Sequence, residues 1–189
     1  MSLKACILGI LALRDMTGYD LKNTFDRSVS YVWSSSSTQI YTALKSLAED
    51  GSVQSDLIVQ ESKPNKRVYR ITPKGLSYLE EWLMSPTEPR LAKDDFLVRV
   101  FFANQIDDIQ ALQVLEQNLA NMELQVKELQ EIRTRVTSRP SQNARARLYQ
   151  LMSLDLRVSG LNGMIAETRR QMEQIRSLIT ESLTKESSS

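Results

Sequence analysis

Side chains able to bind a polyanion gather in a short stretch that follows Trp33. This stretch contains hydroxyl, amide and amine groups at Ser36, Ser37, Thr38, Gln39, Tyr41, Thr42 and Lys45. Small hydroxyls allow close approach to DNA, the Gln39 amide can pair with an adenine edge, and Tyr41 and Lys45 can bind phosphates. The alternative is a polar helix face that only contacts water.

A second stretch is strongly basic. Lys63, Lys66, Arg67, Arg70 and Lys74 lie between Ser62 and Leu79, where the sequence has no acidic residue. Because the net charge of the whole chain is only +1, attraction to nucleic acid must come from a local patch of this kind. Pro64 and Asn65 are turn-forming residues, so the basic side chains are expected at the tip of a hairpin that contacts DNA.

Missing residue types exclude most catalytic chemistry. The chain has no histidine, and Cys6 is its single cysteine. The usual zinc sites and the histidine-dependent nucleophilic mechanisms are therefore excluded within one chain. No phosphate-binding glycine motif occurs either. We therefore expect a protein that is not an enzyme and that uses no metal and no cofactor.

The elements that must position these groups form an N-terminal module. Apolar residues predict a core helix over 3–14, and a second helix is expected to begin at Thr17, after a turn at 16–18. Ile40, Leu44 and Leu47 share one face of a third helix, which the serines cap and Gly51 closes. Alternating residues then predict a β-hairpin with arms near 53–59 and 68–71, and a fourth helix opens at 72–75. This order is that of a winged helix-turn-helix domain over residues 1–84.

The C-terminal part changes character after a connection with a short helix over 85–106. From 107 to 183 apolar residues recur every three or four positions, which predicts two long antiparallel helices broken near Pro140. The stripes are too long for one helix pair to bury, so a second copy of the chain is expected to cover them. The predicted dimerisation residues are Leu112, Leu115, Leu119, Met122, Val126, Leu129, Leu151, Leu154, Val158, Leu161, Ile165, Met172, Ile175 and Ile179. Residues 184–189 are expected to be a disordered tail, and the fold class is mainly α with a small β-hairpin.

The first apolar segment, Ala5 to Leu13, superficially resembles a signal peptide. Arg14 and Asp15 follow it at once, and it is about half the roughly 20 residues that a membrane span needs. We therefore expect a core helix and a cytoplasmic protein without a membrane partner.

In its motifs the sequence resembles the PadR-like transcriptional regulators. The resemblance rests on residues 7–11 (ILGIL) with 17–21 (TGYDL), on 40–51 (IYTALKSLAEDG), and on 69–75 (YRITPKG) with Trp82. The C-terminal part is similar to the family branch with a longer, virulence-activator-like helical domain. The resemblance implies a homodimer, usually a repressor, that binds a palindromic operator. By the same resemblance Tyr19 and Tyr41 are tyrosines of the scaffold and recognition helices, and Lys63, Lys66 and Arg67 form the wing tip.

The resemblance also implies a small aromatic effector. Trp33, Phe96, Phe101 and Phe102 are the candidate effector-binding residues, although aromatic side chains near a domain junction are usually core residues. A second interpretation is a helical adaptor whose winged domain binds protein instead of DNA. The operator, the regulated gene and the sign of regulation stay open at this point.

Overall fold

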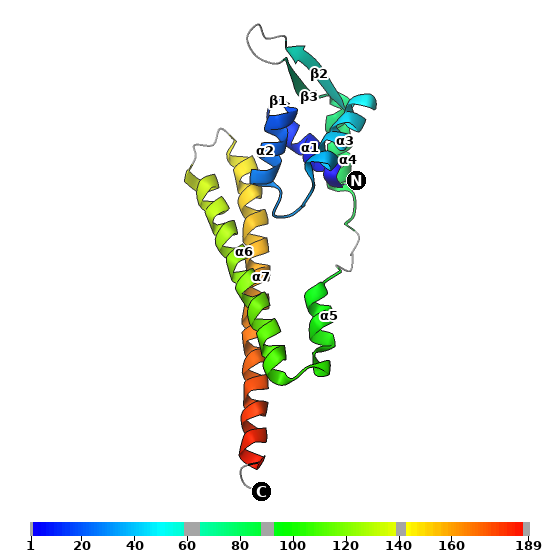
Figure 1. Ribbon diagram of the computed structural model, residues 1–189. Coiled ribbons are helices and arrows are strands. Elements are labelled where there is room, and N and C mark those ends of the chain that lie inside the picture. Colours follow the sequence, from blue (N-terminus) through cyan, green and yellow to red (C-terminus); the bar gives the residue numbers. More distant parts are fainter. Residues whose placement is uncertain (1, 59–64, 88–92, 139–142, 187–189) are drawn as a thin grey trace. The chain divides into compact units, whose positions relative to one another are not determined.

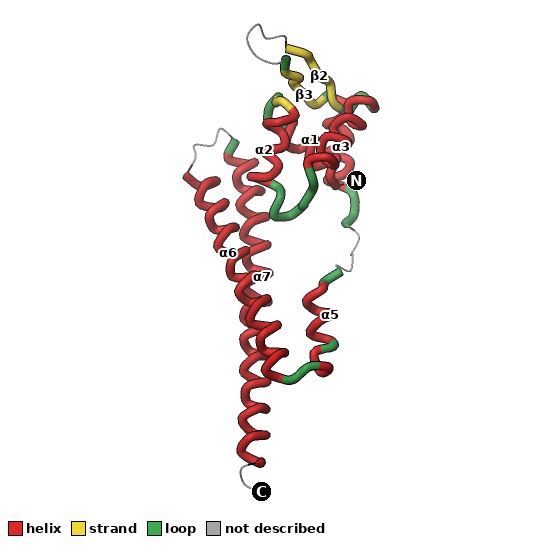
Figure 2. Tube along the Cα trace, viewed as in Figure 1, coloured by secondary structure: helices red, strands yellow, loops and turns green. Residues whose placement is uncertain are grey.

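The computed structural model describes residues 2–58, 65–87, 93–138 and 143–186, and it divides into two compact units, Met1–Pro89 and Arg90–Ser189 (Figure 1). The described residues are mostly helical, with one small antiparallel sheet (Figure 2). This confirms the predicted fold class. Within the described ranges, no helix is long and apolar enough to cross a membrane.

The first unit is built around α1 (Ser2–Leu11), a helix of 10 residues that buries Ala5, Ile7, Leu8, Ile10 and Leu11. Helices α2 (Gly18–Ser28), α3 (Ser37–Glu49) and α4 (Pro73–Met84) all pack on it. The core consists mainly of Ile7, Leu8, Leu11, Leu21, Phe25, Ile40, Leu44 and Leu47. Since α3 buries Ile40, Leu44 and Leu47, its other face must point to solvent.

A three-stranded sheet completes this unit. Strands β1 (Met16–Thr17), β2 (Val53–Ile58) and β3 (Lys66–Ile71) are antiparallel, in the order β1-β3-β2. The hairpin is confirmed, whereas Met16 and Thr17 form a short strand opposite Tyr69 and Val68 instead of the predicted turn. The extended backbone pairs with the edge of β3 and places the Met16 side chain in the core.

The start of α4 is fixed to the base of the hairpin. The Thr72 hydroxyl accepts a hydrogen bond from the backbone N–H of Gly75 at 3.2 Å and donates to the carbonyl oxygen of Gly51 at 2.8 Å. Gly75 lies against the backbone of Ser52, and a Cβ atom added to Gly75 would be 2.2 Å from the Ser52 carbonyl oxygen. The junction therefore needs glycine at position 75 for steric reasons.

The second unit consists of one short and two long helices. Helix α5 (Asp95–Phe101) and a 3₁₀ turn, η1 (Ala103–Gln105), precede the antiparallel pair α6 (Asp108–Ser138) and α7 (Ala144–Glu186) (Figure 1). Leu115, Met122 and Leu129 are buried on α6, seven residues apart, as in a coiled-coil seam. Among the side chains of α7 whose burial is described, the buried apolar ones are Leu154, Leu161, Ile165 and Met172.

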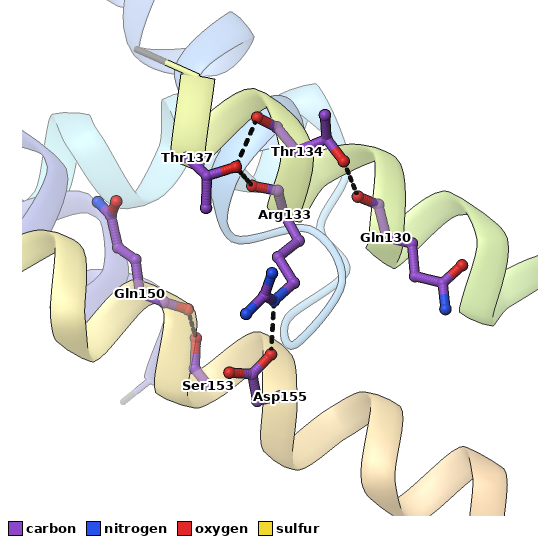
Figure 3. A network of polar contacts seen from close by, with 7 residues as sticks. All are labelled: Gln130, Arg133, Thr134, Thr137, Gln150, Ser153 and Asp155. Carbon is purple, nitrogen blue, oxygen red and sulfur yellow. Dashed lines mark hydrogen bonds and ion pairs between the residues drawn. The ribbon is translucent and has the colours of Figure 1, made fainter. Parts of the chain in front are cut away.

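An ion pair links the two long helices where the apolar series of α6 is interrupted. Arg133 donates from Nε to the Asp155 carboxylate at 2.9 Å, and the carbonyl oxygen of Arg133 accepts from the Thr137 hydroxyl at 3.1 Å (Figure 3). Both charged side chains are about half exposed, so the pair contributes at most about 1 kcal/mol to stability. It adds a polar contact to the apolar packing of the two helices.

Helix α7 also extends further than predicted. It reaches Glu186, so the predicted disordered tail is wrong for residues 184–186, while 187–189 lie outside the described residues. The Thr184 hydroxyl donates to the carbonyl oxygens of Thr180 and Glu181, at 3.1 and 2.9 Å. Such hydrogen bonds satisfy the side chain within the helix itself.

We predict that Gly75→Ala destabilises the winged unit by roughly 1–3 kcal/mol, because the new methyl group collides with the rigid Ser52 backbone. Gly9→Ala is the control, since nothing lies within 4 Å of its added Cβ and alanine favours a helix. Urea denaturation followed by circular dichroism measures both changes. Equal stability of the two variants would contradict the steric explanation.

Candidate nucleic-acid interface

The N-terminus of α3 is held by a reciprocal pair of hydrogen bonds. The Ser36 hydroxyl accepts from the backbone N–H of Gln39 at 3.3 Å, and the Gln39 side-chain oxygen accepts from the backbone N–H of Ser36 at 2.9 Å. The hydroxyl of Ser35 donates to the same Gln39 oxygen at 3.1 Å. This capping box stabilises the helix, and pairing of Gln39 with an adenine would have to replace these bonds. The adenine contact stays a prediction.

The other predicted side chains of α3 lie on its solvent face. Ser37, Thr38, Tyr41 and Thr42 are exposed, opposite the buried Ile40, Leu44 and Leu47. Lys45 is 80% exposed, and its ammonium is 3.7 Å from the Glu49 carboxylate. An exposed pair of this kind is weak, so the Lys45 ammonium can exchange its carboxylate for a phosphate.

The contact between α2 and α3 depends on a glycine that the sequence analysis did not single out for this role. A Cβ atom on Gly18 would be 2.9 Å from Cε1 of Tyr41 and 3.6 Å from Cε2 of Tyr69. Glycine therefore lets the Tyr41 ring lie directly against the start of α2. The neighbouring Tyr19 is 69% exposed, so its hydroxyl is available to a partner.

The basic residues of the hairpin and of the start of α4 fall into two groups, those that face solvent and those that have a partner within the fold. Lys66 and Arg67 are exposed at the start of β3, Asn65 is exposed beside them, and Lys63 lies outside the described residues. Arg70 binds Asp15 at 2.7 Å and lies 3.9 Å from Asp56, and the hydrogen bond with Asp15 raises the pKa of Arg70. Lys74 donates to the carbonyl oxygen of Asp50. Lys66 and Arg67 are thus the cations best placed for an external phosphate.

Comparisons with known proteins match both units. The sequence model of the transcriptional regulator PadR-like family matches residues 7–81, and that of the virulence activator alpha C-terminal domain matches residues 92–166. The sequence therefore combines a PadR-like regulator domain with a virulence activator alpha C-terminal domain. Members of this family regulate transcription and are not enzymes.

Relatives of this PadR-like chain include characterised regulators. The negative transcriptional regulator PadR of Bacillus subtilis is 29% identical over 129 residues, which are 68% of this chain and 71% of PadR. Its crystal structure with operator DNA has a TM-score of 0.81 at 23% identity and covers 93% of this chain and 99% of PadR. Its complex with p-coumaric acid has a TM-score of 0.77 at 21% identity and covers 92% and 95% of the two chains.

A further solved structure is that of the Vibrio cholerae virulence activator AphA. It covers 93% of this chain and 99% of AphA, at 25% identity and a TM-score of 0.73. These comparisons confirm the PadR-like resemblance that the motifs indicated and the winged-helix fold.

The predicted dimerisation residues of this PadR-like chain fall into two classes. Seven of them (Leu115, Met122, Leu129, Leu154, Leu161, Ile165 and Met172) are buried within a single chain. The other seven (Leu112, Leu119, Val126, Leu151, Val158, Ile175 and Ile179) are partly buried. The periodicity therefore located the face that packs within one chain, and the role of these residues in dimerisation stays a prediction.

The candidate effector-binding residues are distributed over both units. Trp33 belongs to the winged unit, whereas Phe96, Phe101 and Phe102 belong to the second unit. Phe96 is half-buried, and Phe101 and Phe102 are exposed and meet edge to face with ring centroids 4.9 Å apart. Among the described residues, no group of three or more histidine, cysteine, aspartate or glutamate side chains is arranged to hold a metal ion.

We predict that Ser36→Ala lowers the free energy of unfolding by about 1 kcal/mol, because it removes the side-chain half of the capping box. Ser37→Ala, one residue later in the same exposed stretch, is the control and should leave stability within about 0.5 kcal/mol of the unmodified protein. Thermal unfolding measures both. A control as destabilised as Ser36→Ala would argue against a specific capping role.

Proposed function

We propose that this PadR-like regulator is a homodimeric repressor in the cytoplasm that binds a palindromic operator. The observation that carries the proposal is the solvent-facing polar side of α3, next to a hairpin on which Lys66 and Arg67 are exposed and form no ion pair with another described residue. The structure of Bacillus subtilis PadR with operator DNA supports DNA as the partner, and the description of that relative as a negative regulator supports repression.

In this proposal the start of α3 enters the major groove. Ser37, Thr38 and Thr42 approach the DNA closely, Gln39 reads an adenine when its cap opens, and Tyr19, Tyr41 and Lys45 bind phosphates. Lys66 and Arg67, with Lys63 and Asn65 beside them, bind the backbone next to the groove. A twofold dimer would place two α3 helices about 34 Å apart, which fits a palindromic operator.

We propose that the partner chain binds an exposed strip on α7, which is separate from the buried apolar face of the same helix. Tyr149, Met152 and Leu156 are exposed, and nothing lies within 4 Å of a Cβ added to Gly160 or Gly163. At 100° per residue these five positions lie on the side of α7 opposite the buried Leu154, Leu161 and Met172. A helix from a second chain can approach closely here, in addition to the half-buried residues of the predicted set.

We also propose that a small aromatic molecule releases the operator. Support comes from the complex of Bacillus subtilis PadR with p-coumaric acid and from the exposed aromatic residues near α5 in this chain. A helical adaptor with a protein-binding winged domain is the alternative function, and changes to the hairpin cations separate the two.

We predict that the double variant Lys66→Glu and Arg67→Glu loses at least tenfold in affinity for the DNA upstream of its own gene. Two fewer phosphate contacts should lower the slope of log affinity against log salt by about 2. Fluorescence anisotropy on specific and scrambled DNA at several salt concentrations measures both quantities. The control is Lys127→Glu, which reverses the charge of one exposed residue on α6. Unchanged DNA affinity in the double variant would support the adaptor function.

We further predict that Leu156→Glu converts the dimer to a monomer, because it places a charge in the centre of the apolar strip. Asn162→Glu adds the same charge to α7 away from the strip and should remain dimeric. Sedimentation velocity at several protein concentrations gives the oligomeric state. If both variants remain dimers, the partner chain binds a different face.

A further inference from the structure

Lys22 on α2 lies beside two tyrosines of the candidate nucleic-acid interface. At 100° per residue, Lys22 lies between Gly18 and Tyr19 around the helix axis. Gly18 is the position at which the Tyr41 ring meets α2, since a Cβ atom there would be 2.9 Å from Cε1 of Tyr41. Tyr19, on the other side of Lys22, is 69% exposed. The Lys22 side chain therefore starts between two phenol groups that are proposed to bind phosphates.

In the free chain the Lys22 ammonium is held by a carboxylate. It donates a hydrogen bond to Asp26, which lies one helical turn later on α2. This hydrogen bond raises the pKa of Lys22, and the nearby phenol groups of Tyr19 and Tyr41 raise it further. The ammonium therefore carries its charge near neutral pH. The side chains of Lys22 and Asp26 are 33% and 41% exposed, so the ion pair is open to solvent.

An exposed ion pair between residues four apart on one helix is weak, so the Lys22 ammonium can leave Asp26 for another anion. Arg70 in the same unit is different, because it lies between two carboxylates, those of Asp15 and Asp56. Among the described residues, Asp26 is the single carboxylate that pairs with Lys22. A DNA phosphate offers the ammonium a comparable partner, and its binding releases a counterion from the DNA. Exchange is therefore easier for Lys22 than for Arg70.

We propose that Lys22 binds a DNA phosphate together with Tyr19 and Tyr41, and that Asp26 holds the Lys22 ammonium until the phosphate replaces it. The inference rests on the proposed DNA-binding function and deepens it, because it adds a phosphate contact from α2 and an acidic residue that opposes binding. Each binding event must break the ion pair between Lys22 and Asp26, and the freed carboxylate also repels the phosphate. Asp26 therefore lowers the affinity for DNA.

The test is a double-mutant cycle, measured on the full-length protein by fluorescence anisotropy with the DNA upstream of its own gene. Asp26→Asn should tighten binding about threefold, because it frees the ammonium. Lys22→Gln should weaken binding about fivefold and lower the slope of log affinity against log salt by about 1. In the Lys22→Gln background, Asp26→Asn should change the affinity by less than about 1.5-fold, since no ammonium is left to free.

Two further variants separate a phosphate contact from a structural effect. Lys22→Arg keeps the charge and should keep the salt slope of the unmodified protein. Arg27→Gln is the matched control, because it removes an exposed cation from another side of α2. It should change neither the affinity nor the slope. Circular dichroism shows whether each variant is folded.

Other outcomes would overturn the exchange at Lys22. An equal gain from Asp26→Asn in both backgrounds would mean that Asp26 acts by general repulsion alone. If the unmodified protein prefers upstream to scrambled DNA and folded Lys22→Gln binds the upstream DNA equally well, the contact is excluded and the proposed function stands. If the unmodified protein binds no DNA at any salt concentration, the proposed function and this inference both fail.

Discussion

The burial of α1 is the constraint on which the winged unit depends. This helix has apolar residues on nearly every side, and α2, α3, α4 and β3 all pack against it. Leu8 also lies next to the junction at Gly75, where a Cβ atom would be 3.1 Å from Leu8 Cδ2. The same helix therefore sets the orientation of α3 and the position of the hairpin base. The polar face of α3 is exposed because the core requires Ile40, Leu44 and Leu47 on the inner face. A surface that can bind DNA thus follows from a packing requirement.

Polar residues around this surface divide between holding the fold and facing solvent. Ser36 and Gln39 cap the N-terminus of α3, and Thr72 caps the N-terminus of α4. Arg70 on β3 forms an ion pair with Asp15. The side chains of their neighbours Ser37, Lys66 and Arg67 form no hydrogen bond or ion pair with another described residue. In the sequence the two groups look alike, since both consist of serines or cations in a polar stretch. Only the direction of each side chain separates them, because strand residues alternate between faces and a cap residue points back along its helix.

Periodicity was sufficient to predict the helices, the hairpin and the long C-terminal pair, because each buries one regular apolar face. It could not predict β1, whose two residues are too few for a pattern and which exists only because β3 offers an edge. Nor could the periodicity predict which apolar residues of α7 are buried by the same chain. Leu154, Leu161 and Met172 are buried by their own chain, whereas the exposed Leu156 lies on a face that carries two glycines and is weak as a hydrophobic signal.

Helix α7 presents two apolar faces to different neighbours. One face packs on α6 within the chain, and the other carries the exposed strip around Leu156 that is proposed for a second chain. Because both faces belong to one helix, a change that turns α7 on α6 also turns the strip. The packing of the helix pair and the geometry of the proposed dimer are therefore linked. The buried residues that fix α7 on α6 also decide which way the strip faces.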